Sequence, residues 1–121
     1  MVNQILYPQE VEVFYVIPTI RKELARVMLK EGLEQKEIAK LLGVTEAAIS
    51  QYLNEKRANE IKFNSSIKQE IANSVRRIRK SEDSIIEVQK ILKLIFESRL
   101  ICKYHRKFSK VPRGCAVCFE K

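Results

Sequence analysis

Residues 35–42 alternate apolar and charged positions with the period of a helix. The lysines and glutamates of this stretch would face water while one side stays apolar. Gly43 follows, and glycine most readily adopts the left-handed conformation wanted just past a helix C-terminus. The pattern therefore predicts a helix over residues 35–42 that ends in a tight turn. Its apolar positions are Ile38, Ala39, Leu41 and Leu42.

A second helix is predicted directly after this turn, running to about residue 53. Thr45 is its expected N-cap, because a threonine hydroxyl can accept a hydrogen bond from a free backbone N–H one turn on. Ile49, Tyr52 and Leu53 fall on one side of this helix. The other side carries small and amide side chains that could enter a major groove and hydrogen-bond base edges. That outer side consists of Thr45, Glu46, Ala47, Ser50, Gln51 and Asn54.

Ala39 decides how these two helices can pack. Helices that cross steeply over a short turn need a small side chain at their closest approach, and alanine provides one without leaving a cavity. An ordinary helical hairpin is the competing interpretation, since apolar and polar positions alternate in any bundle. The alanine, the glycine and the capping threonine together favour a helix-turn-helix.

The chain before this motif is less regular. Residues 11–17 are rich in β-branched and aromatic side chains, which is typical of a strand, but apolar residues also recur there at helical spacing. We favour a helix, kinked or broken at Ile17–Pro18, because proline disfavours the α conformation of the residue before it. Residues 19–30 have a plainer helical stripe, and Gly32 is the predicted stop. The stripe consists of Ile20, Leu24, Val27 and Met28.

After the motif, residues 54–64 are mostly polar and are expected to form a loop. Ser66 and Gln69 match a capping box that would open the next helix. The apolar positions of that helix are Ile67, Ile71, Val75 and Ile78. Its last turn is basic, with Arg76, Arg77, Arg79 and Lys80. These cations suit a helix C-terminus or a phosphate contact equally well.

Ser81 is the expected cap of a long final helix whose apolar residues, between Ile85 and Ile101, cover more than one face. A helix that is apolar around its circumference is buried on two sides, which in a small domain indicates packing against a second subunit. The alternative is the central helix of a monomeric bundle. We expect a homodimer formed through residues 82–101.

Composition limits the class of protein. The chain has 121 residues, of which 45% are hydrophobic, so one domain with a real core is expected. No apolar run approaches the roughly 20 residues of a membrane span. Three cysteines are an odd number, which fits a reducing compartment and a thiolate site better than a disulfide framework. These features predict a cytoplasmic protein without a membrane contact.

Charge is unevenly distributed along the chain. Residues 1–60 contain 8 Lys and Arg against 9 Asp and Glu, a net charge of −1. The remaining residues hold 15 basic and 6 acidic side chains, a net charge of +9. The helix-turn-helix half therefore lacks a strong positive field of its own. Its obvious candidates for contacts to a nucleic-acid backbone are Lys36, Lys40, Lys56 and Arg57.

The C-terminal part contains all the cysteines and the single histidine in the spacing C-x2-H-x9-C-x2-C. Two short-spaced pairs suit a tetrahedral site, because each pair provides one edge of the tetrahedron. The predicted metal ligands are Cys102, His105, Cys115 and Cys118. Zinc is favoured, and an iron–sulfur cluster is the alternative. A buried Cys102 and a separate redox pair of cysteines would explain the same residues without a metal.

The stretch from residue 35 to 53 resembles the Cro and phage-repressor type of helix-turn-helix, also called the XRE family. Gln35 opens the first helix, Ala39 lies at the crossing, and Ile49 packs the second helix. More loosely, the chain is similar to archaeal transcriptional regulators with a cysteine-bearing tail. The resemblance implies that Gln35 and Thr45 contact phosphates and that Glu46, Ser50 and Gln51 reach bases. It also places Ala47 and Asn54 close to DNA.

Together these patterns predict an all-α protein, a helical bundle containing a helix-turn-helix, followed by a long dimerisation helix and a short metal-binding knuckle. Residues 1–60 would bind DNA, residues 61–101 would form the dimer, and residues 102–121 would hold zinc or an iron–sulfur cluster. The expected function is a dimeric, sequence-specific regulator of transcription that binds double-stranded DNA.

Two other classes of protein are alternatives to this interpretation. A protein-interaction module could use the helix-turn-helix as a packing unit and the metal as a staple. An enzyme with Cys102 as nucleophile and His105 as base is disfavoured, because the sequence offers no third group to orient them and no oxyanion feature.

Overall fold

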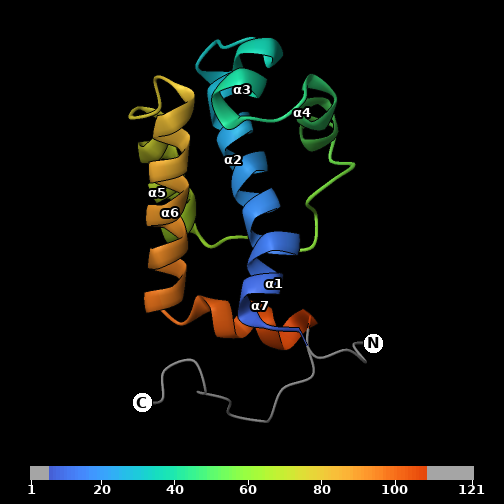
Figure 1. The fold of residues 1–121 in the computed structure, drawn as a ribbon, viewed down its shortest axis with the longest axis vertical. Coiled ribbons are helices and arrows are strands. Elements are labelled where there is room, and N and C mark those ends of the chain that lie inside the picture. The colour runs from blue at the N-terminus through green and yellow to red at the C-terminus, as the bar shows by residue number, and fades with distance from the viewer. Residues whose placement is uncertain (1–5, 109–121) are drawn as a thin grey trace.

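The computed structural model of the protein describes residues 6–108, and this part of the chain folds into helices joined by short segments (Figure 1). In chain order the helices are α1 (Pro8–Val11), a π-helix η1 (Glu12–Val16), α2 (Ile17–Lys30), α3 (Gln35–Leu42), α4 (Glu46–Leu53), α5 (Ser65–Val75), α6 (Ser81–Glu97) and α7 (Leu100–Phe108). The predicted all-helical class is thus confirmed for residues 6–108.

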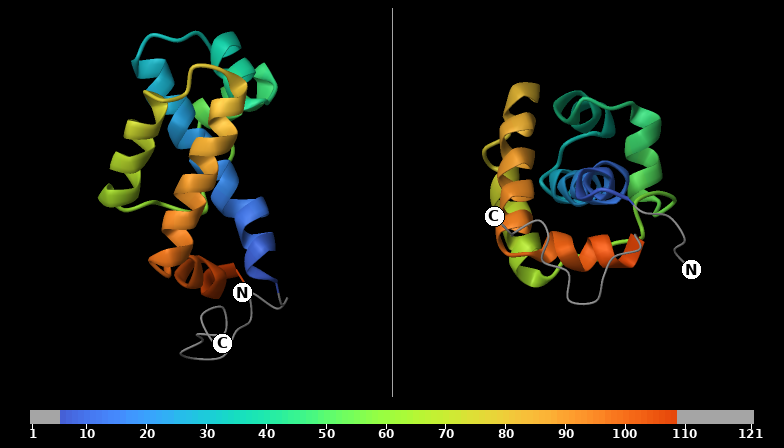
Figure 2. Two further views of the ribbon diagram at one scale, coloured as in Figure 1. Left: turned by 60° about the vertical axis from the view of Figure 1, so that its left-hand side comes forward. Right: turned by 60° about the horizontal axis from the view of Figure 1, so that its bottom comes forward.

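Helix α2 runs through the middle of the bundle (Figures 1 and 2). It contacts α3 and α4 of the motif as well as α5 and α6. In both figures α4 and α6 lie on opposite sides of α2, and α7 crosses the end of the bundle nearest to α1. The helix-turn-helix and the later helices therefore share one central support.

The buried stripe of α2 agrees with the predicted pattern. Ile20 and Leu24 are fully buried, and Met28 is 1% exposed. Buried side chains from every other helix of residues 6–108, including η1, join them in one core cluster that extends from Val11 to Tyr104. Past the end of α2, Gly32 has a φ of 96° and the Leu33 N–H donates to the Met28 carbonyl at 3.1 Å. This is the left-handed termination expected of glycine.

The segment before α2 is helical, as favoured, and the chain is not broken at Pro18. Instead, the Ile17 N–H donates to the Glu12 carbonyl five residues back, which is the pattern of a π-helix. In a regular α-helix the ring of Pro18 would clash with the carbonyl four residues earlier. The wider turn relieves this clash, and the Thr19 hydroxyl donates to the Tyr15 carbonyl at 2.7 Å.

Two predicted helix caps were wrong. Helix α5 is capped by Asn64, whose Oδ1 accepts from the Ile67 N–H at 2.9 Å, so Ser66 and Gln69 do not form the cap. Helix α6 begins at Ser81 with Lys80 in the cap position. Asn64 caps the helix in place of Ser66 because Asn64 directly precedes the first helical residue and has the extended backbone conformation of a cap.

Asp83 completes the start of α6. Its carboxylate accepts from the N–H groups of Arg79 at 2.9 Å and Lys80 at 3.1 Å. The hydrogen bond from Arg79 is the main reason that the pKa of Asp83 is lowered, and the bond from Lys80 adds to it. The acidic first turn predicted for this helix therefore stabilises the helix through its third residue.

The long helix predicted to reach Ile101 ends instead at Glu97. The Ser98 N–H donates to the Leu94 carbonyl at 3.0 Å, and Arg99 takes a left-handed φ of 63°. This turn brings Ile101 and Tyr104 of α7 into the core, where they are 1% and 6% exposed. Burial of these two side chains outweighs the cost of one non-glycine residue in the left-handed region.

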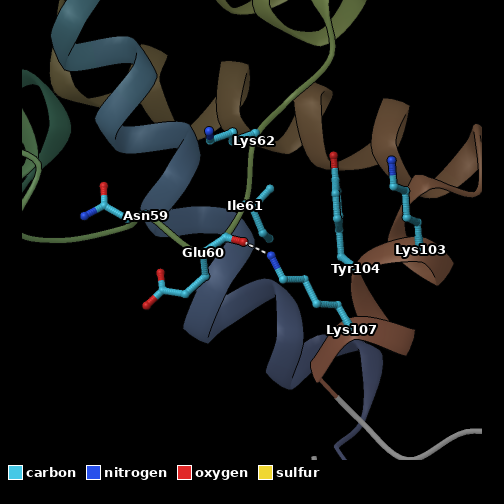
Figure 3. Close-up of a pocket in the computed structure, with 7 residues that line it drawn as sticks. All are labelled: Asn59, Glu60, Ile61, Lys62, Lys103, Tyr104 and Lys107. Carbon is cyan, nitrogen blue, oxygen red and sulfur yellow. Dashed lines mark hydrogen bonds between the residues drawn. The ribbon is translucent and has the colours of Figure 1, made fainter. Parts of the chain in front are cut away.

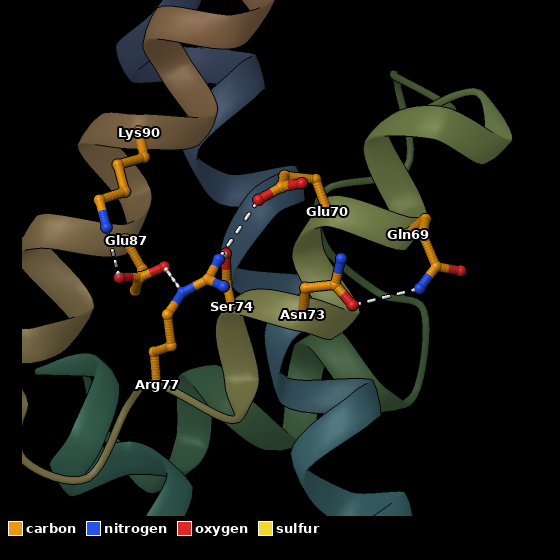
Figure 4. A network of polar contacts seen from close by, with 7 residues as sticks. All are labelled: Gln69, Glu70, Asn73, Ser74, Arg77, Glu87 and Lys90. Carbon is orange, nitrogen blue, oxygen red and sulfur yellow. Dashed lines mark hydrogen bonds and ion pairs between the residues drawn. The ribbon is translucent and has the colours of Figure 1, made fainter.

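Helices α5 and α6 are joined by a polar network around Glu87 (Figure 4). Glu87 is only 4% exposed and lies opposite Arg77, whose Nε donates to its Oε1 at 2.8 Å. Lys90 approaches the other oxygen at 3.4 Å, and Arg77 also reaches Glu70 at 3.2 Å. Arg77 therefore has a structural role, whereas Arg76 and Arg79 form no ion pair with any other of residues 6–108.

The residues described include no helix that is both long and apolar enough to cross a membrane. Nothing in this fold tests the division into residues 1–60, 61–101 and 102–121, which stays a prediction.

The buried carboxylate of Glu87 leads to a prediction about stability and pH. Burial raises the pKa of Glu87, but the hydrogen bonds and charges of Arg77 and Lys90 together hold it below its usual value. A carboxylate whose pKa is lowered in the folded state stabilises the protein at any pH above its unfolded pKa of about 4.3. This stabilisation is lost as the pH falls through the pKa of the folded state. Glu87→Gln should therefore lower the melting temperature by a few degrees at pH 7 and by less at pH 3.

Thermal melts at the two pH values would measure this difference, with Glu97→Gln as the matched control on the exposed end of α6. The acid sensitivity contributed by Asp83 is present in every variant and cancels. An equal destabilisation by Glu87→Gln at both pH values would contradict the proposed charge interaction.

Candidate nucleic-acid interface

The turn between α3 and α4 is formed as the sequence predicts. Gly43 has φ 68° and ψ 35°, and the Val44 N–H donates to the Ala39 carbonyl at 3.0 Å. A Cβ at Gly43 would meet nothing within 4 Å, so the need for glycine there is conformational. An alanine would cost about 1 kcal/mol on this account. Ala39 is 5% exposed at the crossing of the two helices.

Helix α4 begins at the predicted cap. The Thr45 hydroxyl oxygen accepts from the Ala48 N–H at 3.1 Å. On the inner side Ile49 is fully buried and Tyr52 is 2% exposed, while Leu53 is half-buried. Ala48, which the sequence pattern did not assign to either side, is also buried. The small alanine lets the first turn of α4 lie close against the core.

The outer side of α4 faces solvent along the residues predicted to meet DNA. Thr45, Glu46, Ala47, Gln51 and Asn54 are exposed, and Ser50 is half-buried. Gln35 is exposed at the first position of α3. The structure thus brings most of the predicted contact residues onto one exposed surface, which we call the recognition surface and define as residues 45–47, 50, 51 and 54.

Within the recognition surface two polar pairs are already formed. The Asn54 side-chain amide donates to the Ser50 hydroxyl at 3.3 Å, and Arg57 Nη1 donates to Gln51 Oε1 at 3.4 Å. The Arg57 guanidinium also lies 5.6 Å from the centre of the Tyr52 ring. Arg57 is therefore held beside Gln51, where its free N–H groups could reach a phosphate.

The segment after α4 is fixed by residues that sequence reasoning missed. Lys22 of α2 is 7% exposed, and its Nζ donates to Asn59 Oδ1 at 2.7 Å. Asn59 in turn donates from its amide to the Glu55 carbonyl. Arg26 pairs with the Glu55 carboxylate at 3.4 Å. These contacts tie the C-terminal end of α4 to α2, and no short-range spacing could have revealed them because 37 residues separate Lys22 and Asn59.

Positive charge near the recognition surface is sparse, as the charge count indicates. Lys36 and Lys40 are exposed on α3, and Lys56 is exposed after α4. The carboxylate of Glu46 lies on the same helix as the amides. A surface of amides, hydroxyls and few cations is better suited to reading base edges than to holding any duplex by charge alone.

Two of the four predicted metal ligands are described. Cys102 and His105 are both half-buried on α7, and the His105 Nε2 contacts the Leu6 carbonyl. Cys115 and Cys118 lie outside the described residues. Within residues 6–108, no three side chains of the His, Cys, Asp and Glu types gather as a metal site. Cys102 and His105 both lie on α7, a helix separate from the long helix α6.

Comparison with known proteins gives one family match. Residues 24–59 match a family model described as Helix-turn-helix. The chain matches no curated protein and no solved structure. The matched residues run from the second half of α2 to the segment after α4 and so include the turn, the crossing alanine and the recognition surface. Residues 24–59 are therefore a helix-turn-helix of the Cro and phage-repressor type.

Proposed function

We propose that the protein is a sequence-specific, DNA-binding regulator of transcription. The observation that carries this proposal is the recognition surface itself. A capped helix is supported from behind by buried Ile49 and Tyr52, and it presents hydroxyl and amide groups to solvent at the positions to which the resemblance to Cro and phage-repressor motifs assigns DNA contacts. Rigid support matters because base recognition requires donors and acceptors to be placed to within a fraction of an ångström.

The proposed roles of the contact residues combine what the resemblance implies with the position and chemistry of each side chain. Gln35 and Thr45 begin their helices, where backbone N–H groups also point outward, and we assign them to phosphates. The oxygen of Thr45 accepts a bond from the backbone, but its hydroxyl hydrogen remains available to donate. Ser50 and Gln51 would reach base edges, with Ala47 and Asn54 beside them. Lys56 and Arg57 would bind the DNA backbone.

Glu46 gives the surface a negative group. A carboxylate repels phosphates, but it can accept a hydrogen bond from the amino group of a cytosine. At the first position of α4 it also favours the positive end of the helix. We therefore assign Glu46 to a base contact near one end of the recognised sequence.

A homodimer formed through α6 would complete the DNA-binding unit. Ile85 and Ile86 on this helix are 63% and 53% exposed, and Phe96 is 38% exposed near its end. Ile91 and Ile95 on the inner side of the helix are fully buried, and the exposed apolar side chains lie on its other sides. Since α6 lies across α2 from α4, a partner on α6 would leave the recognition surface free (Figures 1 and 2). Two such surfaces would read half-sites roughly 34 Å apart.

A metal held by Cys102, His105, Cys115 and Cys118 remains part of the proposal. The contact between His105 Nε2 and the Leu6 carbonyl suits it, because metal-bound histidines commonly donate their second ring N–H to a carbonyl. Nδ1 would then face the ion. Zinc would act as a structural staple, whereas an iron–sulfur cluster would supply redox sensitivity.

The site would act on α7 and on the start of the chain. Phe108 of α7 stacks on Tyr15, with ring centres 3.8 Å apart and planes 6° apart, and α7 also packs against α1. Loss of metal would therefore loosen the end of the bundle far from α3 (Figure 1). A protein-interaction module with a metal staple is the alternative, and it predicts no specific footprint on DNA.

Gln51→Ala tests base reading. We expect it to weaken binding to a selected operator by about 1 to 3 kcal/mol and to change binding to random DNA little. Binding isotherms at several salt concentrations would measure both, with Gln69→Ala on the exposed side of α5 as the control. Equal losses on both DNAs would remove Gln51 from the base-reading set, and the absence of any specific footprint would favour the interaction module.

Ile85→Lys tests the dimer. Sedimentation at micromolar concentration should show a dimer for the parent and a monomer for the variant, with operator affinity reduced roughly tenfold or more by loss of the second half-site. Leu29→Lys places the same charge on a side chain of α2 that is 44% exposed, and it should leave the dimer intact. A monomeric parent with unchanged DNA affinity in both variants would contradict the proposal.

Cys115→Ser tests the metal site. Protein purified without oxygen should contain zinc or iron by elemental analysis, and an absorption band in the visible region would identify a cluster. The variant should lose the metal and melt at a lower temperature, and a chelator added to the parent should have the same effect. A parent free of both metals, together with a variant that melts like it, would show that these residues are not a metal site.

A further inference from the structure

A pocket of about 340 Å³ lies between residues 59–62 and α7, away from the recognition surface (Figure 3). Its volume is near the lower end of the range of about 300 to 1,000 Å³ that is typical of small-molecule sites. Neither DNA recognition by α4 nor the metal ligands account for the side chains that line it. The side chains that line the pocket therefore indicate which ligand it could bind.

The charged groups around the pocket are mostly cationic. Lys62, Lys103 and Lys107 line it, and Glu60 is the one acidic residue among its described lining residues. In Figure 3 the carboxylate of Glu60 points away from the lysines of α7. The Lys107 ammonium donates to the Glu60 carbonyl, which holds it at the pocket and leaves two of its three N–H groups for a ligand.

Tyr104 adds an independent observation. It is 6% exposed, and its ring packs edge-on against Phe63 with centres 6.1 Å apart. Among the residues that the structure describes, none forms a hydrogen bond with its hydroxyl, so the hydroxyl hydrogen is available to donate. Figure 3 shows this hydroxyl at the same end of the pocket as the Lys103 amine. No buried side-chain oxygen or nitrogen of residues 6–108 lacks a hydrogen-bond partner, so this unpaired hydroxyl is open to solvent, and a ligand in the pocket could accept its hydrogen bond.

Donors from three side chains, at least two of them charged, suit a ligand with several oxygens and more than one negative charge. A phosphoryl group has both properties, whereas a single carboxylate has two oxygens and one charge. We propose that this pocket binds a phosphoryl group through the ammonium groups of Lys103 and Lys107 and the hydroxyl of Tyr104, with Lys62 adding positive charge at its edge.

The phosphoryl group could come from a small phosphate ester or from the DNA backbone, and two titrations distinguish these sources. In the first, the full chain is titrated with inorganic phosphate and with adenosine monophosphate at constant ionic strength. In the second, its affinity for DNA is measured as a function of salt. The first titration does not depend on DNA recognition, so a failure of the proposed regulator function would leave it interpretable.

Two variants alter the pocket with little effect on packing. Lys103→Gln removes the charge of an exposed side chain, and Tyr104→Phe removes only the hydroxyl while keeping the buried ring. Lys93→Gln, exposed on α6, is the control with the same change in net charge. Thermal melts of all three should resemble that of the parent, which separates loss of a ligand contact from loss of the fold.

For a small-molecule source, the parent should bind at least one of the two phosphate ligands, and each pocket variant should weaken that binding about tenfold while Lys93→Gln does not. For a DNA source, neither inorganic phosphate nor adenosine monophosphate should bind the parent or any variant. Lys103→Gln should then reduce the slope of log DNA affinity against log salt concentration by about one. If Lys103→Gln and Tyr104→Phe behave like Lys93→Gln in both titrations, the proposal is wrong.

Discussion

Burial of the stripe along α2 is the constraint on which the rest of the structure depends. Ile20, Leu24 and Met28 are almost completely removed from water, and the helix that carries them is contacted by α3, α4, α5 and α6. A small domain buries a limited apolar surface, and a helix that packs against both the helix-turn-helix and the later helices lets one apolar stripe serve both. The helix-turn-helix is consequently stabilised by contacts that reach well beyond its own residues.

That shared support connects the recognition surface to the remainder of the chain. Lys22 lies on the polar flank of α2 and binds Asn59, while Arg26 one turn later binds Glu55, so the end of α4 is held by the same helix that carries the core stripe. Such contacts limit how α4 can tilt without disturbing α2. They also hold the start of residues 54–64 against α2, although this segment has no regular helix.

The other end of the molecule is organised by aromatic and cationic groups. Tyr15 stacks on Phe108, Phe63 packs on Tyr104, and Lys107 reaches back to the loop at Glu60. These contacts join α7 to parts of the chain that are far from it in sequence. A ligand or a metal bound near α7 would therefore act on the end of the bundle opposite α3, and any effect on DNA binding would have to pass through α2 or residues 54–64 (Figure 1).

The sequence by itself determined the local features. A glycine that must be left-handed, a threonine that caps, and apolar residues at helical spacing act over one or two turns, so their consequences could be predicted without a partner. The bounds of α3, the turn at Gly43 and the exposed side of α4 follow from such rules.

Tertiary structure alone decided features that join distant residues. The end of α6 at Glu97 depends on the burial of Ile101 and Tyr104. The free energy of that burial cannot be predicted from the local spacing of apolar residues. The choice of Asn64 over Ser66 as a cap depends on where the loop arrives after crossing the core. The pocket beside α7 arises because residues 59–62 and 103–107 are brought together by the fold, more than 40 residues apart in the chain. Long-range packing sets these outcomes, since the free energy it contributes is larger than the differences between alternative local patterns.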